Sequence, residues 1–384
     1  MYQDIFNSAT IEGMVAAPGS KWHRDPPDVI PLWLAEPDFP VAMEIKKALL
    51  NAVQDEDLFY NGDIPARTAM SEKINRVNGL NTTIEDIMIT QGVTPGMWVA
   101  LRHATNEGDD VVVTNPMYGP FFNAVNVTNC KQLHWNLSYE EGYKFDIEEL
   151  KKLITPRTKL IFVCNPHNPC GRRMTEEELK GIADVAVDHN IEVFSDDLHE
   201  DIIFDGKKHI TLASLNPEIE ALTMTSWGFS KTFCVAGLQI GYLCSTNKEV
   251  MADIRKQASG AMRGTSTLSK AAVPVMCSTK LDWWRRDIMT HYHKTRELAY
   301  KRLDEMGISY PKLEATYLMY PKFDWGMTCA EIDEFLFKEA RVRLSQGTNF
   351  GSNGEGHMRM SIASSMGIMT EAFDRMEKAV SKLK

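Results

Sequence analysis

Four polar segments of the sequence each follow a short apolar run that is typical of a buried strand. They are residues 90–96 (TQGVTPG), 165–171 (NPHNPCG), 195–199 (SDDLH) and 226–233 (SWGFSKTF). In open α/β sheets, ligands bind just beyond the carboxyl ends of the strands. We therefore expect these segments to meet around one ligand, and the residue types in each segment indicate the chemistry that it offers.

The first segment has the composition of an anion-binding turn. Gly92 permits a tight turn, and Pro95 suits the first turn of a helix, where its missing N–H is not needed. The free N–H groups of Gly92, Val93 and Thr94 would then face an anion at the positive end of the helix dipole. Taken alone, the segment could also be a plain capped turn. It is not a Walker loop, because the required lysine and hydroxyl residue do not follow.

The second and third segments offer an amide and an acid. Two prolines and a glycine stiffen residues 165–171, so Asn168 can direct its amide at a ligand, although a purely structural turn is the alternative. An acid at a buried strand end is costly unless it meets a cation. Asp196, Asp197 and His199 could hold a metal or could be exposed solubilising groups. No supporting cluster of ligands accompanies them, so we do not expect a metal.

The fourth segment contributes a lysine. Lys231 lies among hydroxyl and aromatic residues, where a lysine can lose solvation, so that its pKa falls and it becomes nucleophilic towards a carbonyl. A solvated surface lysine is the alternative for this segment alone. Together, however, an anion cradle, an amide, an acid and a lysine match pyridoxal 5′-phosphate (PLP), which presents a phosphate, a phenolate oxygen, a pyridine nitrogen and an aldehyde.

The elements that must position these groups alternate along the chain. We predict strands at 111–114, 159–164, 191–195, 222–226 and 238–244, with helices at 95–104, 175–188 and 248–260. Thr175 and Glu178 form a capping box that starts the second of these helices. Strands that alternate with helices predict an α/β fold with a mostly parallel sheet between helices.

The C-terminal part does not continue the alternation of strands and helices. Residues 281–306 predict one long charged helix between two domains, with His291 and His293 at its surface. Antiparallel strands at 317–322 and 323–325 and helices at 329–340 and 370–384 should follow. We therefore predict a large α/β domain at 49–284, and a smaller α+β domain that combines 285–384 with the N-terminal arm, 1–48.

Composition excludes several function classes. The chain of 384 residues carries a net charge of −10 and no run of Lys or Arg longer than a pair, so we expect no nucleic-acid partner. Its apolar runs are far shorter than the roughly 20 residues that span a bilayer. Seven cysteines without paired spacing, and a start that does not resemble a signal peptide, predict a cytoplasmic protein.

With these motifs in place, the sequence resembles the PLP enzymes of fold type I in the class I/II aminotransferase superfamily. Its resemblance is strongest to the MalY/PatB branch of C–S lyases, which are similar to cystathionine β-lyase. Besides the segments above, the resemblance is carried by residues 21–22 (KW), 30–35 (IPLWLA), 236–239 (AGLQ) and 350–359 (FGSNGEGHMR). It runs nearly from end to end, and it implies a homodimer, because sites of this fold type are usually built between two subunits.

The resemblance also implies a role for individual residues. Lys231 would bind the cofactor covalently and move the proton at Cα, and Asp196 would keep the pyridine nitrogen protonated. Arg359, with Asn168 and Ala35, would bind the substrate, the arginine gripping its α-carboxylate. The implied cofactor residues besides Lys231 and Asp196 are Asn168 and His199 at the phenolate oxygen, Tyr118 on the ring face, Gly92, Val93, Thr94 and Ser230 at the phosphate, and Tyr60 at the phosphate of the neighbouring subunit.

Three positions depart from the pattern of relatives. Gly228 stands where a phosphate-binding serine is common, and Ser226 or Ser230 could replace that hydroxyl. Gln239 stands where aminotransferases commonly have an arginine, as is frequent in the lyase branch. Residues 35–39 (AEPDF), with Glu36 and Pro37, are closer to aminotransferases than to that branch.

These features favour β-elimination from cystathionine or another cysteine S-conjugate. Aminotransfer is the second hypothesis, and other PLP chemistry on an amino acid in a biosynthetic pathway is the third. A binding or regulatory module without turnover is a further alternative, against which the complete set of Lys231, Asp196, Asn168 and Arg359 argues. The choice between the reactions depends on pocket contacts of about 1–3 kcal/mol, which the motifs do not encode.

Overall fold

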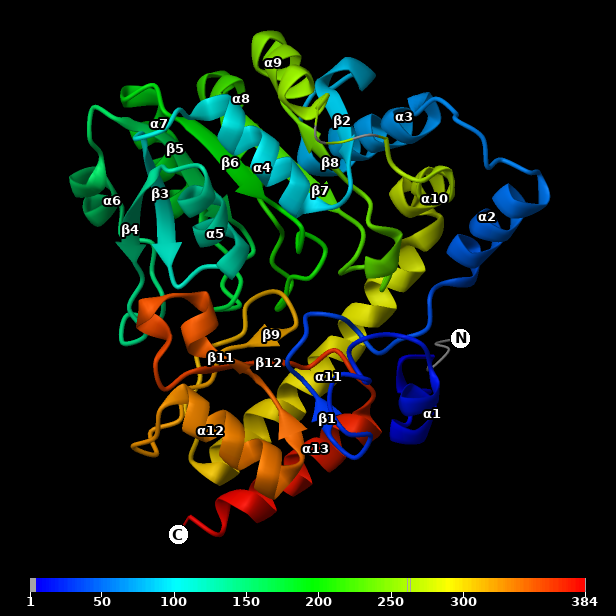
Figure 1. Ribbon diagram of the computed structural model, residues 1–384, viewed down its shortest axis with the longest axis vertical. Coiled ribbons are helices and arrows are strands. Elements are labelled where there is room, and N and C mark those ends of the chain that lie inside the picture. The colour runs from blue at the N-terminus through cyan, green and yellow to red at the C-terminus, as the bar shows by residue number, and fades with distance from the viewer. Residues whose placement is uncertain (1–4, 261, 263, 384) are drawn as a thin grey trace.

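The protein is built around a seven-stranded sheet with helices on both faces (Figure 1). The structure, a computed structural model, describes residues 5–260, 262 and 264–383. In spatial order the strands are β2 (Ile87–Thr90), β8 (Gly241–Cys244), β7 (Thr223–Gly228), β6 (Glu192–Asp196), β5 (Thr158–Cys164), β3 (Asp110–Asn115) and β4 (Lys131–Asn136). The five predicted strands are all present, with shifted ends.

The direction of the strands decides where the polar segments meet. Strands β7, β6, β5, β3 and β4 are parallel, as predicted for most of the sheet, whereas β8 runs antiparallel to both β7 and β2. Because β7 and β2 are both antiparallel to β8, β2 runs in the same direction as β7. The carboxyl ends of β2, β5, β6 and β7, which precede the four polar segments, therefore lie at one edge of the sheet.

The five predicted ranges include neither β2 nor β4, the two strands at the ends of the sheet. For β4 the reason is its burial pattern. Its residues alternate between exposed and buried, so it has no continuous apolar run. The central strand β3, in contrast, is buried at all of its residues. An apolar run marks only a strand that is covered on both faces.

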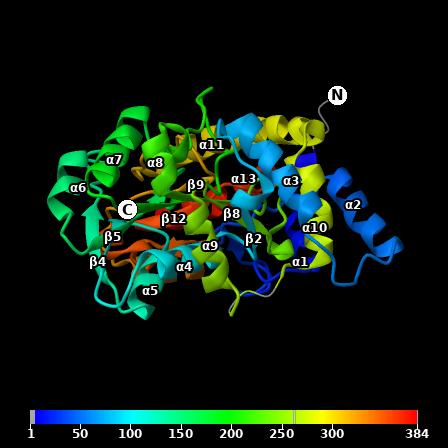
Figure 2. The same ribbon diagram turned by 90° about the horizontal axis from the view of Figure 1, so that it is seen from above.

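Helices cover both faces of the sheet (Figure 2). One face carries α4 (Val93–Ala104), α5 (Gly119–Val127) and α9 (Lys248–Ala258), and the other carries α6 (Ile147–Leu153), α7 (Glu176–Asp188) and α8 (Pro217–Leu222). The capping box of α7 is confirmed: the side chain of Thr175 accepts from the backbone of Glu178, and the Glu178 side chain accepts from that of Thr175. Helix α4 begins at Val93, two residues earlier than predicted.

A second, smaller unit lies below the sheet in Figure 1 and joins the two ends of the chain. Strand β1 (Ile30–Pro31) of the N-terminal arm pairs in parallel with β10 (Val342–Arg343). A three-stranded antiparallel sheet holds β11 (Ser345–Gln346), β12 (Met358–Ser361) and β9 (Leu318–Met319). The helices of this unit are α1 (Ile11–Ala16), the long α11 (Asp282–Met306), α12 (Cys329–Phe335) and α13 (Met366–Val380).

The remaining helices connect the units. Helix α2 (Met43–Gln54) and helix α3 (Ile64–Lys73) both pack against α10 (Thr267–Cys277). Because α2 begins at Met43, it crosses the proposed boundary between residues 48 and 49. The division into 49–284 and 1–48 with 285–384 remains our proposal.

The antiparallel strands predicted at 317–322 and 323–325 are confirmed only in part, since β9 (Leu318–Met319) pairs antiparallel with β12. Only β9 forms there, because Pro321 has no N–H to donate and its carbonyl accepts from Met358 instead. Phe323 likewise donates to Gly356, so both segments pair with the chain near β12 rather than with each other. Helices α12 and α13 confirm the helices predicted in this region, although α13 begins at Met366 and the predicted end, Lys384, lies outside the described residues.

The long helix α11 confirms the prediction for 281–306, but His291 is not at the surface. Its ring is fully buried beside Phe6 and Phe39, and its Nε2 lies 2.8 Å from the carbonyl of Ser364. The N-terminal arm and the chain before α13 cover this side of α11, which a helical pattern alone does not reveal. Across the described residues, every helix is too short or too polar to traverse a lipid bilayer.

Candidate active site

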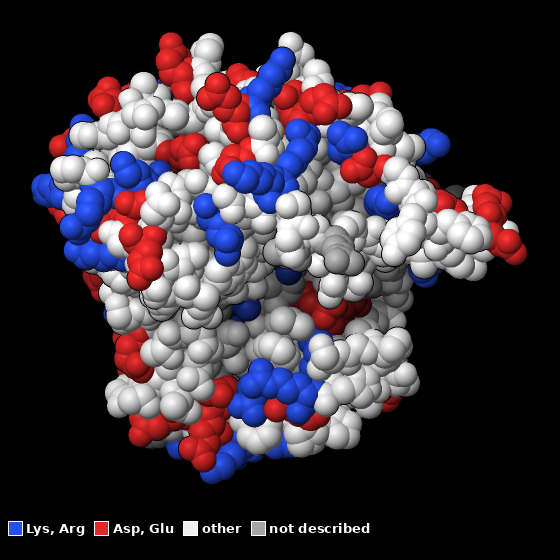
Figure 3. Space-filling view, turned by 45° about the horizontal axis from the view of Figure 1, so that its top comes forward, with Lys and Arg blue, Asp and Glu red and all other residues white. Residues whose placement is uncertain are grey.

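The residues predicted from the sequence converge on one cavity of about 230 Å³ at the carboxyl edge of the large sheet. The predicted residues that line it are Ala35, Gly92, Val93, Thr94, Tyr118, Asn168, Asp196, His199, Ser230, Lys231 and Arg359. On the face shown in Figure 3, a hollow separates the larger and smaller parts of the molecule, and basic atoms are visible deep within it. Tyr60 does not line this cavity; it lies after α2 and is fully exposed.

The anion cradle is the N-terminus of α4. Gly92 caps the helix with φ at +102°, a conformation that favours glycine. The first N–H groups of the helix, those of Val93 and Thr94 among them, have no carbonyl in the preceding turn to bind. Gly241 of β8 lies so close that a Cβ on it would come within 3.0 Å of the Gly92 backbone. The cradle is therefore fixed by β2 and β8 together.

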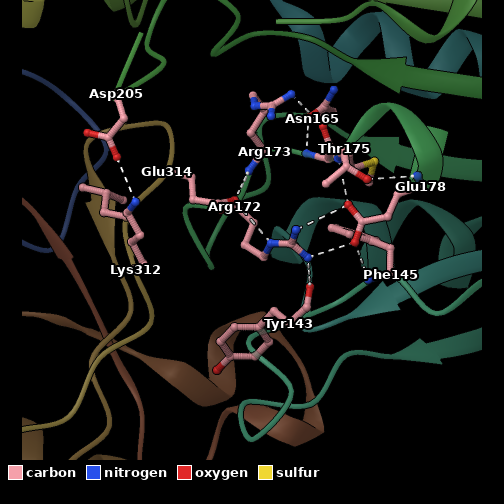
Figure 4. A network of polar contacts seen from close by, with 12 residues as sticks. Tyr143, Phe145, Asn165, Arg172, Arg173, Thr175, Glu178, Asp205, Lys312 and Glu314 are labelled. Atoms are coloured by element: carbon pink, nitrogen blue, oxygen red, sulfur yellow. Dashed lines mark hydrogen bonds and ion pairs between the residues drawn. The ribbon is translucent and has the colours of Figure 1, made fainter. Parts of the chain in front are cut away.

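The loop that carries Asn168 is braced at its base. The side chain of Asn165 accepts from the N–H of Met174 at 3.0 Å, and the carbonyl of Gly171 accepts from Glu314 and Ala315 in the smaller unit. Figure 4 shows Arg172 next to this base, where its guanidinium donates to Glu178 at 3.0 Å. These contacts tie the loop to α7 and to the C-terminal part at once, so Asn168 is held in place from both sides.

Arg359 of β12 reaches the same loop from the opposite side of the cavity. Its Nη1 donates to Oδ1 of Asn168 and its Nη2 to the carbonyl of Trp33, each at 3.0 Å. The guanidinium lies 4.5 Å from the ring centre of Phe350, and burial lowers the pKa of Arg359 to about 10. Its buried Nε has no partner among the described residues. An unpartnered donor on a buried guanidinium favours the binding of an anion there.

Asp196 ends β6 at the floor of the cavity. Its Oδ1 accepts from the N–H of Leu198 at 3.0 Å, and burial raises the pKa of Asp196 to about 7, with a further rise from the charge of Asp197. A cationic group placed against this carboxylate would favour its charged form. The geometry suits a protonated ring nitrogen.

His199 lies one turn further along the chain. It is buried, its ring lies edge-on to Tyr317 at 5.7 Å, and its Nδ1 has no partner among the described residues. Burial keeps its pKa well below the usual value, so the ring is neutral and can donate from one nitrogen only. The unpartnered Nδ1 of His199 and the Nε of Arg359 are two buried polar atoms in this cavity that a ligand would satisfy.

Lys231 follows β7, and its amine has a lowered pKa and a fixed hydrogen-bond partner. Burial, followed by the positive charge of Arg359, lowers the pKa of Lys231 to about 8, so an appreciable fraction is neutral near pH 8. Its Nζ donates to the carbonyl of Ala35 at 2.6 Å, and that carbonyl also accepts from the hydroxyl of Tyr317 at 2.9 Å. The Lys231 amine therefore loses its proton at a lower pH than the amine of a surface lysine, and its hydrogen bond to Ala35 holds it in a defined position.

Tyr118 lies at the wall of the cavity, immediately before α5. Burial raises its pKa above the usual value, so it remains a neutral phenol. Its aromatic ring is half-buried and lines the cavity, where a ring face of a ligand can lie against it.

The structure separates the two serines that could replace the hydroxyl missing at Gly228. Ser226 points into the sheet, where its hydroxyl donates to the carbonyl of Tyr242 at 3.1 Å, whereas Ser230 lines the cavity. A Cβ on Gly228 would come within 2.8 Å of the side chain of Leu198. Leu198 therefore occupies the space into which a serine at Gly228 would project.

The other two departures lie outside the cavity. Gln239 is exposed and does not line it. Glu36 and Pro37 line a neighbouring cavity of about 440 Å³ near α1, and only Ala35 of that segment reaches Lys231 directly. Glu36 still acts on the site through space, since its charge raises the proton affinity of Lys231.

Sequence reasoning missed several cavity residues. They are Leu34, Gln91, Cys164 and Leu198, with Pro95 known only as part of the turn. Each stands next to a predicted residue in the sequence, which is the signal that could have found them. Within the described residues, no group of three or more His, Cys, Asp or Glu side chains is arranged to hold a metal ion.

The set of groups in this cavity fits PLP. A helix N-terminus faces the place for a phosphate, an acid lies where a ring nitrogen needs one, and an amide and a neutral imidazole offer donors to an oxygen. The lysine with the lowered pKa supplies the amine for the aldehyde.

Comparison with known proteins agrees with this geometry. Residues 27–376 match the family described as aminotransferase class I and II. The chain is 31% identical to aromatic-amino-acid aminotransferase 2 of Thermococcus litoralis, over 93% of this chain and 92% of that protein. It is 30% identical to the cystathionine beta-lyase PatB of Bacillus subtilis, over 92% of this chain and 93% of the lyase.

Solved structures share the whole fold. A PLP-bound protein of Clostridium difficile 630, described as a candidate aminotransferase, superposes with a TM-score of 0.92 at 27% identity. The superposition covers 98% of this chain and 99% of the other.

Proposed function

We propose that the chain, which belongs to the class I and II aminotransferase family, a PLP-dependent family of fold type I, is a carbon–sulfur β-lyase. Its substrate would be cystathionine or another cysteine S-conjugate, and its products pyruvate, ammonia and a thiol. The observation that carries the proposal is the convergence of Lys231, Asp196, Asn168 and Arg359 on one cavity. It supports chemistry at Cα of an amino acid with a free carboxylate.

In this proposal Arg359 binds the substrate α-carboxylate. The planar guanidinium can offer two parallel donors to a carboxylate, and its contacts to Asn168 and Trp33 hold it in orientation. Asn168 uses its carbonyl oxygen for Arg359, which leaves its NH₂ group to donate to the phenolate oxygen of the cofactor. One amide would thus connect the cofactor with the residue that orients the substrate.

Lys231 is the proposed base. When bound, PLP supplies an aldehyde that condenses with amines and a conjugated ring that accepts the electron pair of a bond broken at Cα. The amino group of the substrate would release the Lys231 amine, and the freed Nζ would remove the proton from Cα. Its lowered pKa keeps part of the amine neutral for this purpose. Asp196 would hold a proton at the ring nitrogen and thereby strengthen the ring as an electron acceptor.

Elimination and aminotransfer share this proton removal and differ afterwards. Elimination breaks the Cβ–S bond and releases a thiol, whereas aminotransfer releases a 2-oxo acid and retains the amino nitrogen. The similarity to PatB supports elimination. The side chains of Glu36 and Pro37, which differ from the lyase branch, line the neighbouring cavity rather than this one.

Aminotransfer is the second candidate. It is supported by the 31% identity to an aromatic-amino-acid aminotransferase and by residues 35–39, which resemble the aminotransferase pattern.

We also propose that the enzyme works as a cytoplasmic homodimer. Leu58, Phe59 and Tyr60 are exposed large side chains in the segment after α2, with exposed fractions of 59%, 77% and 109%. A contiguous apolar surface of this kind is typical of an interface. A second copy would cover it and could bring Tyr60 to the phosphate site of its partner. All seven cysteines are free, which agrees with a reducing compartment.

The reaction is tested with pure protein loaded with PLP. L-Cystathionine is added without any 2-oxo acid, and pyruvate, ammonia and free thiol are measured; amino-acid and 2-oxo-acid pairs are tested in parallel. Pyruvate with an equal amount of thiol supports the lyase. Turnover only in the presence of a 2-oxo acid would select aminotransfer, and no turnover with either set would reject both reactions.

A further inference from the structure

Asp197, the residue after the proposed ring-nitrogen acid, is not used by the mechanism above, although it is completely buried. Its Oδ1 accepts from the hydroxyl of Ser195 at 2.6 Å. Its Oδ2 accepts from the hydroxyl of Thr211 at 3.0 Å and faces Nε2 of His209 at 2.7 Å. An ionised carboxylate can only accept, so all three partners must donate to it. Three side chains thus hold the Asp197 carboxylate in one orientation.

The donors of Asp197 belong to a larger buried network. Thr211 accepts from Asn78 at 3.0 Å, and Asn78 also donates to Glu200 at 2.7 Å. Lys73 donates to Asn78 at 3.0 Å and forms an ion pair with Glu200. In this series of hydrogen bonds each donated hydrogen has one acceptor group. The charge of Glu200 is balanced by that of Lys73. The network therefore anchors the Asp197 side chain between the large sheet and the end of α3.

The backbone couples this anchor to the cofactor site. The N–H of Asp197 donates to the carbonyl of Ser226 at 3.0 Å, and its carbonyl accepts from Glu200 at 3.0 Å. The turn that presents Asp196 and His199 to the cavity thus contains Asp197, whose side chain points away from that cavity into the network. The charge of Asp197 acts on Asp196 through space and raises the pKa of Asp196.

We propose that Asp197, held by His209 and Thr211, is a positioning residue that retains the proton shared between Asp196 and the ring nitrogen of the cofactor. A nearby negative charge raises the proton affinity of an acid, and the same field stabilises a cationic ring that lies against that acid. This inference rests on the proposed PLP site and goes beyond it, because Asp197 and His209 do not line the cavity.

Other charges act on the same turn. The charge of Asp197 raises the pKa of Asp196, whereas the charge of Lys231 lowers it. Burial and the charges of both aspartates raise the pKa of Cys164, so its thiol remains protonated. The ion pair of Glu200 with Lys73 lies on the far side of Thr211. Asp197 does not line the cavity, so replacing it leaves the cavity lining intact.

The test measures the protonation of the ring nitrogen directly. Holoenzyme is prepared with PLP labelled with ¹⁵N in the ring, and the ¹⁵N chemical shift is followed as pH is raised through the neutral range. In Asp197→Asn we expect the ring nitrogen to lose its proton at a pH lower by roughly one unit or more than in the wild type. The matched control is Asp110→Asn. Asp110 is also fully buried and accepts from a threonine, but it is the first residue of β3 and lies at the edge of the sheet away from the cavity. The control should titrate like the wild type.

A second variant separates charge from geometry. His209→Phe removes one donor but keeps the negative charge of Asp197, so the ring nitrogen should stay protonated while PLP dissociates faster. If Asp197→Asn does not fold, the titration is made on Asp197→Ser, which also removes the negative charge and keeps a hydroxyl for the buried network. An unchanged titration in a folded variant that lacks the Asp197 charge, or a deprotonated ring in His209→Phe, would overturn the proposal. Wild-type protein that binds no PLP at all would instead reject the proposed function.

Discussion

The guanidinium of Arg359 donates to the side-chain carbonyl of Asn168 at 3.0 Å, across 191 positions of sequence. The contact joins β12 of the smaller unit to the rigid loop after β5 of the large sheet. The group that would orient the substrate and the group that would bind the cofactor oxygen are thus fixed relative to each other. Neither can shift without disturbing the other, and this coupling leads to the first prediction.

Arg359→Lys should weaken binding of amino acids by roughly a hundredfold, because one ammonium cannot replace the paired donors of the guanidinium, and charged hydrogen bonds contribute about 1.5–3 kcal/mol. The spectrum of bound PLP should change little. Dissociation constants are measured by absorbance titration with an L-amino acid and with the amine that lacks its carboxylate. Equal weakening for both ligands would show that Arg359 does not contact the carboxylate.

Lys231→Ala should abolish the visible absorption band of the holoenzyme and the labelling of the protein by borohydride. Loss of a positioned base and nucleophile should also reduce turnover by at least about 10²–10⁴-fold. The matched control is Lys248→Ala, which changes an exposed lysine at the start of α9. A normal spectrum in Lys231→Ala would remove the proposed cofactor anchor.

Asp196 should make the cofactor-free protein less stable as pH rises. Burial raises its folded-state pKa to about 7, above the usual value of 3.8, so the folded state binds the proton more tightly than the unfolded state. The stabilising protonated form is therefore present below about pH 4 and is lost as pH rises towards 7.

Asp196→Asn removes this titration and keeps an oxygen for the N–H of Leu198. Its gain in free energy of unfolding over the wild type should be about 2–3 kcal/mol larger at about pH 8 than at about pH 5. Urea unfolding of both cofactor-free proteins measures the difference. A gain that does not vary with pH would contradict the raised pKa of Asp196.

His103 should stabilise the opposite edge of the sheet at low pH. It lies between Glu192 of β6 at 3.1 Å and Asp253 of α9 at 2.8 Å. The hydrogen bond to Glu192, more than any other contact, raises the pKa of His103 to about 8, above its usual value of 6.5. Its contribution is therefore complete below 6.5 and disappears as pH rises through about 8.

His103→Gln should accordingly lower the free energy of unfolding by about 1–2 kcal/mol near pH 6 and by much less near pH 9. His189→Gln, a change at an exposed histidine after α7, is the control and should show no such dependence. The same loss at both pH values would mean that packing, and not the ion pairs of His103, stabilises this edge.

Local sequence was sufficient to predict five of the seven strands of the large sheet and the polar groups at the strand ends. The turn before α4, the loop with Asn168, the acid after β6 and the lysine after β7 are each determined by a few neighbouring residues. Their meeting could also be expected, because parallel strands end at a common edge. The edge strand β4 was missed for a related reason: being covered on fewer sides, it lacks the apolar run by which buried strands are identified.

The direction of individual side chains was beyond local reasoning. Asp196 faces the cavity, whereas its neighbour Asp197 faces the network of His209, and Ser230 rather than Ser226 reaches the cavity. His291 was expected at the surface but is buried by segments far away in the sequence. In each case the deciding neighbour comes from another strand, helix or loop.

The sequence by itself therefore determined the kind of fold, the cofactor and the principal reactive groups, because glycine, proline, hydrophobic periodicity and charge act through short-range geometry. Only the tertiary structure decided that Arg359 meets Asn168, that Lys231 lies against Ala35 and that the charge of a second buried carboxylate acts on Asp196. Those relationships depend on the packing of segments that are remote along the chain. Burial there, which no single segment fixes, also sets the pKa values on which the proposed chemistry depends.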